Sequence, residues 1–155
     1  MLSTEIRAKI QADREHYPEP RAACIEAMKM VQREHGWVND EHLREIAGLL
    51  DMSVADLDGV ATFFNQIYRK PVGKNVILLC DSITCYMLGH EQVQNSITKC
   101  LGIKPGQTSA DKQFTLIPTQ CLGCCDHAPA LMVNDDLHHD VDPDQMETLL
   151  SRYRG

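Results

Sequence analysis

The stretch VILLCDSITC, residues 76–85, decides the fold. Its first half, Val76–Cys80, is a short continuous apolar run, which is the pattern of a buried strand. Cys80 ends this predicted strand, and Cys85 follows after four further residues. The stretch therefore predicts a small sheet that carries a pair of cysteines where one of its strands ends.

A second group of cysteines lies further along the chain, in the stretch CLGCC at residues 121–125. It separates two further predicted strands, Phe114–Ile117 and Ala130–Asn134. Because loops from the ends of neighbouring strands converge, we expect the two cysteine groups to meet at one point. Four deprotonated cysteines, two for each iron, are what a [2Fe–2S] cluster requires. The sequence thus predicts an electron carrier with a [2Fe–2S] cluster in its C-terminal half.

The fourth ligand stays open on spacing alone. Cys124 and Cys125 are adjacent, so their side chains are expected to diverge, and both are not expected to reach the same cluster. The spacing from Cys121 to Cys124 suits zinc, whereas the spacing from Cys121 to Cys125 suits a wider iron–sulfur loop.

Other interpretations of the cysteines are kept beside this one. A structural zinc site with four cysteines would make the chain a zinc-stabilised interaction module without a redox role. A thiol oxidoreductase fits less well, because Cys121 and Cys124 precede a strand and do not open a helix. Cys24 and Cys100 fall on apolar helical faces and are expected to be core residues.

Composition excludes several classes of function. The 155 residues include 15 Lys and Arg against 22 Asp and Glu, a formal charge of −7, and only 5% are aromatic, which disfavours nucleic-acid binding. No Gly-x-Gly-x-x-Gly fingerprint is present, so no dinucleotide site is expected on this chain. The longest clearly apolar run is far shorter than the ~20 residues of a membrane span. The N-terminus lacks the pattern of a secretory signal. We expect a cytoplasmic protein or the mature form of an organelle protein.

Helical patterns fill the first part of the chain. Apolar spacing and cap residues predict four helices, over residues 4–16, 21–36, 39–50 and 53–64. A linker with Pro71 and Gly73 follows, and then the strands alternate with a helix over 89–101 and a last helix from Asp142. We expect an α/β (α+β) chain with a helical N-terminal region over residues 1–70 and a second domain over residues 71–155.

A combination of short stretches carries a resemblance to a known family. Two of them hold the cysteines, CDSITC at 80–85 and CLGCCD at 121–126; the others are Pro20–Ala23, Gln32–Val38, Ala61–Phe64, Pro71–Lys74, Gly106–Thr108 and Phe114–Leu116. Together they resemble the E subunit of bacterial NADH:quinone oxidoreductase (respiratory complex I), within the thioredoxin-like [2Fe–2S] ferredoxin family. The resemblance runs over nearly the whole chain.

The resemblance implies a fold and a ligand set. The family has a helical N-terminal region followed by a thioredoxin-like [2Fe–2S] domain, with ligands in a Cys-x₄-Cys and a Cys-x₃-Cys pattern. Carried onto this sequence, the implied ligands of one [2Fe–2S] cluster are Cys80, Cys85, Cys121 and Cys125. The family often has a small or polar residue where this chain has Cys124, which leaves a spare thiol.

The resemblance also implies a place in an oxidoreductase complex. The chain would be a subunit without a catalytic residue or NADH site of its own. NADH and FMN would bind to a neighbouring flavoprotein subunit, on which the helical region is expected to dock. The cluster would exchange single electrons with that flavin, off the main route to quinone. The chain would lie with other peripheral-arm subunits on the cytoplasmic side of the inner membrane. The equivalent subunit of an NAD-linked hydrogenase or formate dehydrogenase is the alternative.

Three histidines follow the second cysteine stretch. His127, His138 and His139 raise the hypothesis of a Rieske-like site, in which two histidines replace two cysteines. Because four cysteines already suffice, these residues are expected to be surface histidines in turns.

Overall fold

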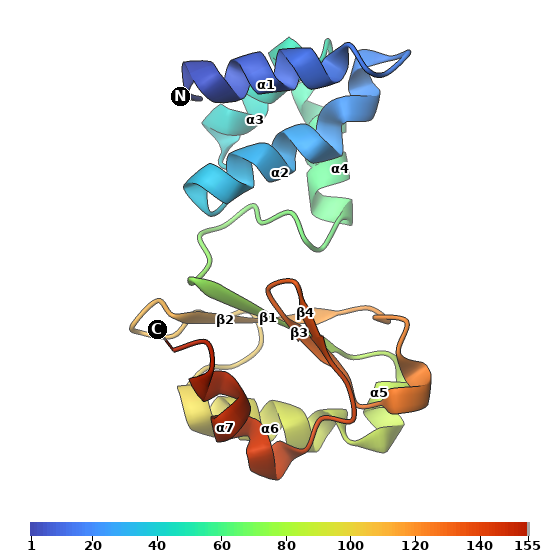
Figure 1. Ribbon diagram of the computed structural model, residues 1–155, viewed down its shortest axis with the longest axis vertical. Helices are drawn as coiled ribbons and strands as arrows, with labels where there is room; N and C mark the ends of the chain where they lie inside the picture. The colour runs from blue at the N-terminus through green and yellow to red at the C-terminus, as the bar shows by residue number, and fades with distance from the viewer. Residues whose placement is uncertain (155) are drawn as a thin grey trace. The chain divides into compact units, whose positions relative to one another are not determined.

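The computed structural model describes residues 1–154 and divides the chain into two compact units, Met1–Pro71 and Val72–Gly155 (Figure 1). Within the described residues, no helix has both the length and the apolar character needed to cross a membrane.

The first unit is built from helices alone. It contains α1 (Thr4–Arg14), the 3₁₀ turn η1 (Pro20–Ala23), α2 (Cys24–His35), α3 (Asp40–Leu49) and α4 (Val54–Phe63). Two predicted caps are confirmed: the Asn39 side chain accepts from the backbone N–H of His42 at 2.7 Å, and the Ser53 hydroxyl accepts from that of Asp56 at 3.0 Å. These caps satisfy N–H groups that have no partner within the helix.

One side of each helix in the first unit is buried in a common core. The core takes one or more residues from every helix and includes Ile6, Ile10, Met28, Val31, Leu43, Ile46, Leu57 and Ala61. Arg69, which follows the last helix, ties the chain back to this unit through Asp58 (Nε to Oδ1 2.8 Å), Asp40 (Nη2 to Oδ1 2.6 Å) and the carbonyl oxygen of Val38.

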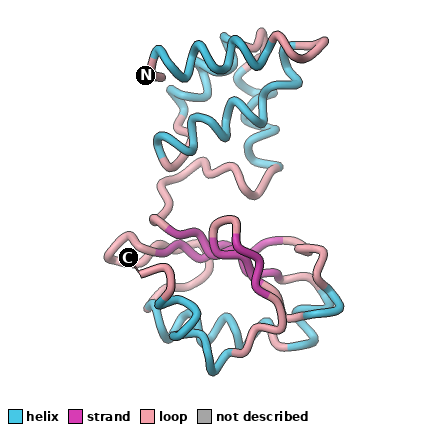
Figure 2. The backbone as a smooth tube through the Cα atoms, in the orientation of Figure 1, coloured by secondary structure: helices cyan, strands magenta, loops and turns pink. Residues whose placement is uncertain are grey.

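The second unit contains a four-stranded sheet. Its helices lie against one face of this sheet, as Figure 2 shows. The strands are β1 (Asn75–Cys80), β2 (Phe114–Thr119), β3 (Leu131–Val133) and β4 (Asp136–His138), in the spatial order β2-β1-β3-β4. β1 is parallel to β2 and antiparallel to β3, which forms a hairpin with β4. The helical elements are α5 (Ile83–Leu88), α6 (His90–Leu101), η2 (Cys125–His127), η3 (Pro143–Gln145) and α7 (Met146–Ser151).

The core of the second unit lies between the sheet and the helices α6 and α7 (Figure 1). Alternate residues of the strands face it, as the two-residue period of a strand requires, and the helices add Val93, Ile97, Met146 and Leu150. Phe114, at the start of β2, is fully buried there.

Neighbouring segments hold β2 near its start and along its outer side. Gly73 approaches the strand so closely that its N–H donates to the Thr115 hydroxyl at 2.6 Å. Along its outer side, β2 is hydrogen-bonded by the loop before it: Gly106 donates to the Leu116 carbonyl oxygen at 2.7 Å, and Leu116 donates to that of Gln107 at 3.1 Å.

The predicted fold class is confirmed, with two additions. The sequence pattern misses α5, which lies within the expected ligand loop, and it misses β4, so the predicted β-α-β-β-α order is incomplete. β4 has only three residues, and its hairpin turns at Asn134, whose φ of 55° is left-handed. Asparagine tolerates this conformation better than most residues.

Candidate metal centre

The parallel pairing of β1 and β2 brings the two cysteine stretches to one edge of the sheet. Cys80 is the last residue of β1 and lies opposite Thr119, the last residue of β2. The pairing continues one residue further, because the N–H of Asp81 donates to the Thr119 carbonyl oxygen at 2.9 Å. The segments that carry Cys85 and residues 121–125 therefore leave the sheet side by side.

Cys80 and Cys85 form the buried half of the site. Each is only 2% exposed, and both pack with Ala130 in a small apolar cluster. The N–H of Cys80 donates to the Ala130 carbonyl oxygen at 3.2 Å, which fixes the end of β1 against β3. Burial, together with the hydrogen bond that the Cys85 thiol donates to the Cys80 side chain, raises the pKa of Cys85 to about 11. Without metal, Cys85 is a neutral thiol at neutral pH.

Cys121 and Cys125 form the exposed half. Their Sγ atoms are 3.3 Å apart, and the N–H of Gly123 donates to the Cys121 sulfur at 3.3 Å. That hydrogen bond lowers the pKa of Cys121, whereas the hydrogen bond between the two sulfurs raises that of Cys125. Gly123 has a φ of 79°, a left-handed conformation that a side chain would strain, so glycine lets this N–H turn toward sulfur.

The two halves also contact each other. The Thr84 side chain, one residue before Cys85, hydrogen-bonds Cys125. The charges of Cys80 and Cys125 both act on Cys85 and raise its pKa. The structure thus brings together the four cysteines that the family resemblance implies as ligands.

The donor set fits an iron–sulfur cluster. Cysteine thiolates are soft ligands, which select iron–sulfur clusters, zinc or Cu(I) over hard cations such as Mg²⁺ and Ca²⁺. Hydrogen bonds from a backbone N–H and a threonine hydroxyl to sulfur favour the thiolate forms that such a site needs.

The family model of the thioredoxin-like [2Fe–2S] ferredoxins matches residues 10–154. The chain belongs to this family. Its relatives include the E subunit of the NADH-quinone oxidoreductase of Pseudomonas aeruginosa, 51% identical over 99% of this chain and 92% of the relative. The corresponding subunit of Escherichia coli K12 is 46% identical with the same coverage. The resemblance inferred from the sequence is therefore confirmed.

Among solved structures, the ferredoxin chain is similar in fold to a chain of the NAD⁺-reducing [NiFe]-hydrogenase in the air-oxidized state. The TM-score is 0.72 at 20% identity, and the match covers 85% of this chain and 23% of the hydrogenase chain. At this identity the likeness concerns the fold alone.

Cys124, the thiol that the resemblance leaves spare, takes no part in the contact between the Cys121 and Cys125 sulfurs. It is half-buried and packs with Leu122 and Ala128 against the apolar cluster of Cys80, Cys85 and Ala130. Burial, followed by the charge of Asp126, raises its pKa. The other two cysteines lie elsewhere: Cys24 in the core of the first unit and Cys100 against the core of the second.

Sequence reasoning missed one positioning residue of the ferredoxin domain. His90, the first residue of α6, is buried, and its Nδ1 donates to the Cys80 carbonyl oxygen at 2.9 Å. This bond ties the end of β1 to the helix below it. A histidine at the start of a predicted helix is not distinctive, so the sequence held no signal for this role.

The three histidines after the second cysteine stretch separate into two kinds. His127 and His139 are exposed, but His138 belongs to β4, is half-buried, and its Nε2 lies 2.8 Å from the Tyr153 hydroxyl. The expectation of a surface turn was therefore wrong for His138. Burial lowers the pKa of His138, so it is neutral at neutral pH.

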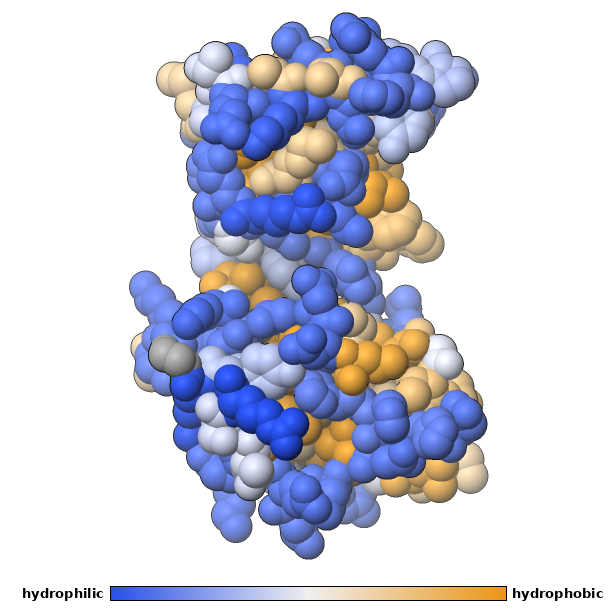
Figure 3. Space-filling view, in the orientation of Figure 1, coloured by the Kyte–Doolittle hydropathy of each residue, from blue (hydrophilic) through white to orange (hydrophobic). Residues whose placement is uncertain are grey.

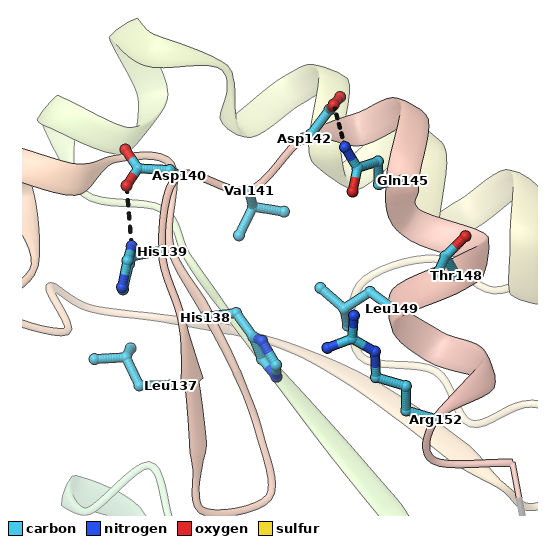
Figure 4. Close-up of a pocket in the computed structure, with 10 residues that line it drawn as sticks. All are labelled: Leu137, His138, His139, Asp140, Val141, Asp142, Gln145, Thr148, Leu149 and Arg152. Atoms are coloured by element: carbon cyan, nitrogen blue, oxygen red, sulfur yellow. Dashed lines mark hydrogen bonds and ion pairs between the residues drawn. The ribbon is translucent and has the colours of Figure 1, made fainter.

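A shallow surface pocket lies against α7, with a volume of about 350 Å³ (Figure 4). None of the described residues that line it is a cysteine; they are Leu137–Asp142, Gln145, Thr148, Leu149 and Arg152. This pocket is not part of the candidate metal centre.

Proposed function

We propose that this chain is an electron-transfer subunit of an NADH-quinone oxidoreductase and holds one [2Fe–2S] cluster through Cys80, Cys85, Cys121 and Cys125. The observation that carries the proposal is the meeting of two cysteine stretches at one edge of the sheet, where the Cys121 and Cys125 sulfurs are 3.3 Å apart. When bound, such a cluster supplies reversible one-electron transfer.

The two pairs of cysteines differ in their exposure to solvent and in the hydrogen bonds that they accept. Cys80 and Cys85 are buried and keep water from one side of the site, whereas Cys121 and Cys125 are exposed and leave the other side open. The Gly123 N–H and the Thr84 side chain hydrogen-bond Cys121 and Cys125. Hydrogen bonds to the cluster's sulfurs and solvent exposure are two of the factors that set a cluster's reduction potential.

An exposed apolar surface beside the site supports docking of a redox partner. Four large side chains of α5, the helix that carries Cys85, are exposed: Ile83 by 71%, Tyr86 by 64%, Met87 by 75% and Leu88 by 58%. Figure 3 shows apolar atoms at the surface where α5 lies. Contiguous exposed apolar residues mark interaction sites. The occupant we propose is the flavoprotein subunit that binds NADH and FMN.

The helical unit is proposed as a second contact with that flavoprotein subunit. Phe63 and Phe64, at the end of α4, are 80% and 40% exposed and stack edge to face with ring centroids 5.3 Å apart. Aromatic residues are enriched in protein interfaces. The assembled complex would place this chain among the peripheral-arm subunits, on the cytoplasmic side of the inner membrane.

The cluster proposal is tested by changing each cysteine to serine in the full chain, purified without oxygen. Iron, acid-labile sulfide, visible absorption and low-temperature EPR after dithionite are measured. Variants of Cys80, Cys85, Cys121 and Cys125 are expected to lose the cluster or to change its spectra. Cys24→Ser and Cys100→Ser are the matched controls and should keep the full iron and sulfide content.

The ligand assignment is tested by Cys124→Ser against Cys125→Ser. The assignment requires that Cys124→Ser keeps the wild-type spectra and that Cys125→Ser does not. The reverse result would make Cys124 the fourth ligand. A colourless wild-type chain that holds zinc, and that iron and sulfide cannot reconstitute, would replace the electron carrier with a zinc-stabilised interaction module.

The fold similarity to an NAD⁺-reducing hydrogenase is the reason to test a second host complex, an NAD-linked hydrogenase or formate dehydrogenase. The tagged chain, purified from its own cells with its bound subunits, discriminates the two. NADH-dependent quinone reduction by the purified complex is expected. Hydrogen- or formate-dependent reduction of NAD⁺ would assign the chain to the alternative host.

A further inference from the structure

His127 and His139 are twelve residues apart in sequence, but the backbone places them together. His127 ends η2, directly after the second cysteine stretch, and His139 follows β4. Two hydrogen bonds join these segments: the N–H of Asp140 donates to the His127 carbonyl oxygen at 2.7 Å, and that of Val141 donates to the Pro129 carbonyl oxygen at 3.0 Å. The positions of both histidines are therefore fixed by main-chain contacts, whatever their side chains bind.

The side chains converge on one carboxylate oxygen. Oδ2 of Asp140 lies 2.8 Å from Nδ1 of His127 and 3.0 Å from Nδ1 of His139. The two imidazole rings have centroids 5.0 Å apart. One ligand atom from each of the three residues lies within 4.8 Å of the other two. Figure 4 shows His139 directed at Asp140, with His138 on the same strand segment turned away from both.

We propose that His127, His139 and Asp140 form a binding site for a divalent transition-metal ion of the zinc type, separate from the cysteine site. Zinc–nitrogen and zinc–oxygen bonds are about 2.0–2.2 Å long, so two tetrahedral ligands of one ion lie roughly 3.3–3.5 Å apart. The two Nδ1-to-Oδ2 distances are a few tenths of an ångström shorter, and exposed side chains can move apart by that amount.

The protons balance without a change in net ionisation. A carboxylate oxygen only accepts hydrogen bonds, so in the metal-free protein both rings carry their proton on Nδ1. When the ion binds at Nδ1, each of these protons is exchanged through solvent for one on Nε2. This exchange leaves the number of protons on each ring unchanged.

The ligand set and its surroundings indicate the class of ion. Two imidazoles with one carboxylate suit Zn²⁺, Ni²⁺ or Cu²⁺, whereas Mg²⁺ and Ca²⁺ prefer oxygen ligands alone. All three side chains are more than half exposed, so the remaining coordination positions are open to water or to a partner's side chain. Other aspartates of the segment 135–144, together with Asp126, add negative charge that attracts a cation.

The test is calorimetric titration with Zn²⁺ of the full chain with its iron–sulfur cluster assembled, in excess Mg²⁺. The Cys124→Ser background removes the thiol that the cluster is proposed to leave free. We expect one zinc ion per chain, and at least ~10-fold weaker binding in His127→Gln and in His139→Gln, since even the loss of an outer-shell partner typically costs that much. His138→Gln is the matched control, because its ring faces Tyr153, and should bind as the parent does.

Equal zinc affinity in the parent and in both histidine variants would overturn the proposal, as would a parent that binds no zinc. Iron and sulfide are assayed before and after each titration. These assays show whether zinc has displaced the cluster, and they keep a failure of the cysteine assignment distinguishable from a failure of the histidine site. His127 and His139 are exposed, so both variants are expected to fold.

Discussion

Adding one methyl group at Gly73 is expected to loosen the sheet that carries the metal centre. A Cβ at this position would lie 2.9 Å from three backbone atoms, the carbonyl oxygen of Lys112 and the N and C atoms of Phe114. None of these atoms belongs to a flexible side chain, so the start of β2 or the linker must move. The N–H of Gly73 would then lose its hydrogen bond to the Thr115 hydroxyl.

The magnitude follows from two opposing effects. Overpacking typically costs about 1–3 kcal/mol, and a backbone collision belongs to the upper part of that range. Gly73 does not have a left-handed φ, so Gly73→Ala also gains about 0.4–1 kcal/mol because the unfolded chain has less conformational freedom. The net loss of about 1–2 kcal/mol corresponds to a roughly 5- to 30-fold larger population of the open state.

Hydrogen exchange followed by mass spectrometry measures this effect separately in each unit. Peptides from β1 and β2 should exchange about 5- to 30-fold faster in Gly73→Ala, provided that exchange follows the opening equilibrium. Gly59→Ala is the matched control, since its added Cβ would meet no atom within 4 Å beyond its chain neighbours and the backbone of its own helix, α4. It should slow exchange in α4 by removing about 0.5–1 kcal/mol of helix destabilisation. Unchanged exchange in the sheet of Gly73→Ala, beside a normal Gly59→Ala effect, would refute the predicted steric clash.

Two further predictions concern the helical unit. Burial is the largest cause that lowers the pKa of His42 below its ordinary 6.5, and the charge of His35 is the next. Below pH 6.5 the unfolded state therefore binds more protons than the folded state. The free energy of unfolding should fall as the pH drops through 6.5. Urea titrations at pH 7 and pH 5 measure this loss, and His42→Gln should reduce it; an equal loss in the variant would contradict the assignment. Arg69→Ala removes hydrogen bonds to two carboxylates and a backbone carbonyl oxygen and should destabilise the unit by about 1–3 kcal/mol. Arg33→Ala, which breaks a largely exposed ion pair, should cost less than about 1 kcal/mol, and equal losses in both variants would refute the special role of Arg69.

Features that depend only on residues close together in the chain could be predicted from the sequence. Asn39 and Ser53 cap helices through bonds to residues three positions on, and such bonds depend only on nearby residues. Val76–Cys80 is a strand because a continuous apolar run of this length needs burial on both faces. The cysteine positions at strand ends followed from these elements.

Features that depend on partners or on distant residues could not be predicted. The apolar side chains of α5 are exposed, so this helix lacks the one-sided pattern that reveals a helix packed on its own core. The contact of His127 with His139 depends on the hairpin of β3 and β4, which has no periodic signal because β4 is so short. Adjacent cysteines such as Cys124 and Cys125 differ only in the direction of their side chains, and spacing does not contain that information.

The hydrogen bonds along the outer side of β2 protect the molecule from self-association. A parallel strand at the edge of a sheet normally offers unpaired N–H and C=O groups to any extended chain that it meets. Here the N–H of Gly106 donates to the Leu116 carbonyl oxygen, and the N–H of Leu116 donates to that of Gln107. The N–H of Ser109 donates to the Phe114 carbonyl oxygen. The opposite edge, β4, is only three residues long and begins at Asp136, beside Asp135. Neither edge of the sheet can readily template the growth of fibrils, although this domain exposes apolar residues on α5.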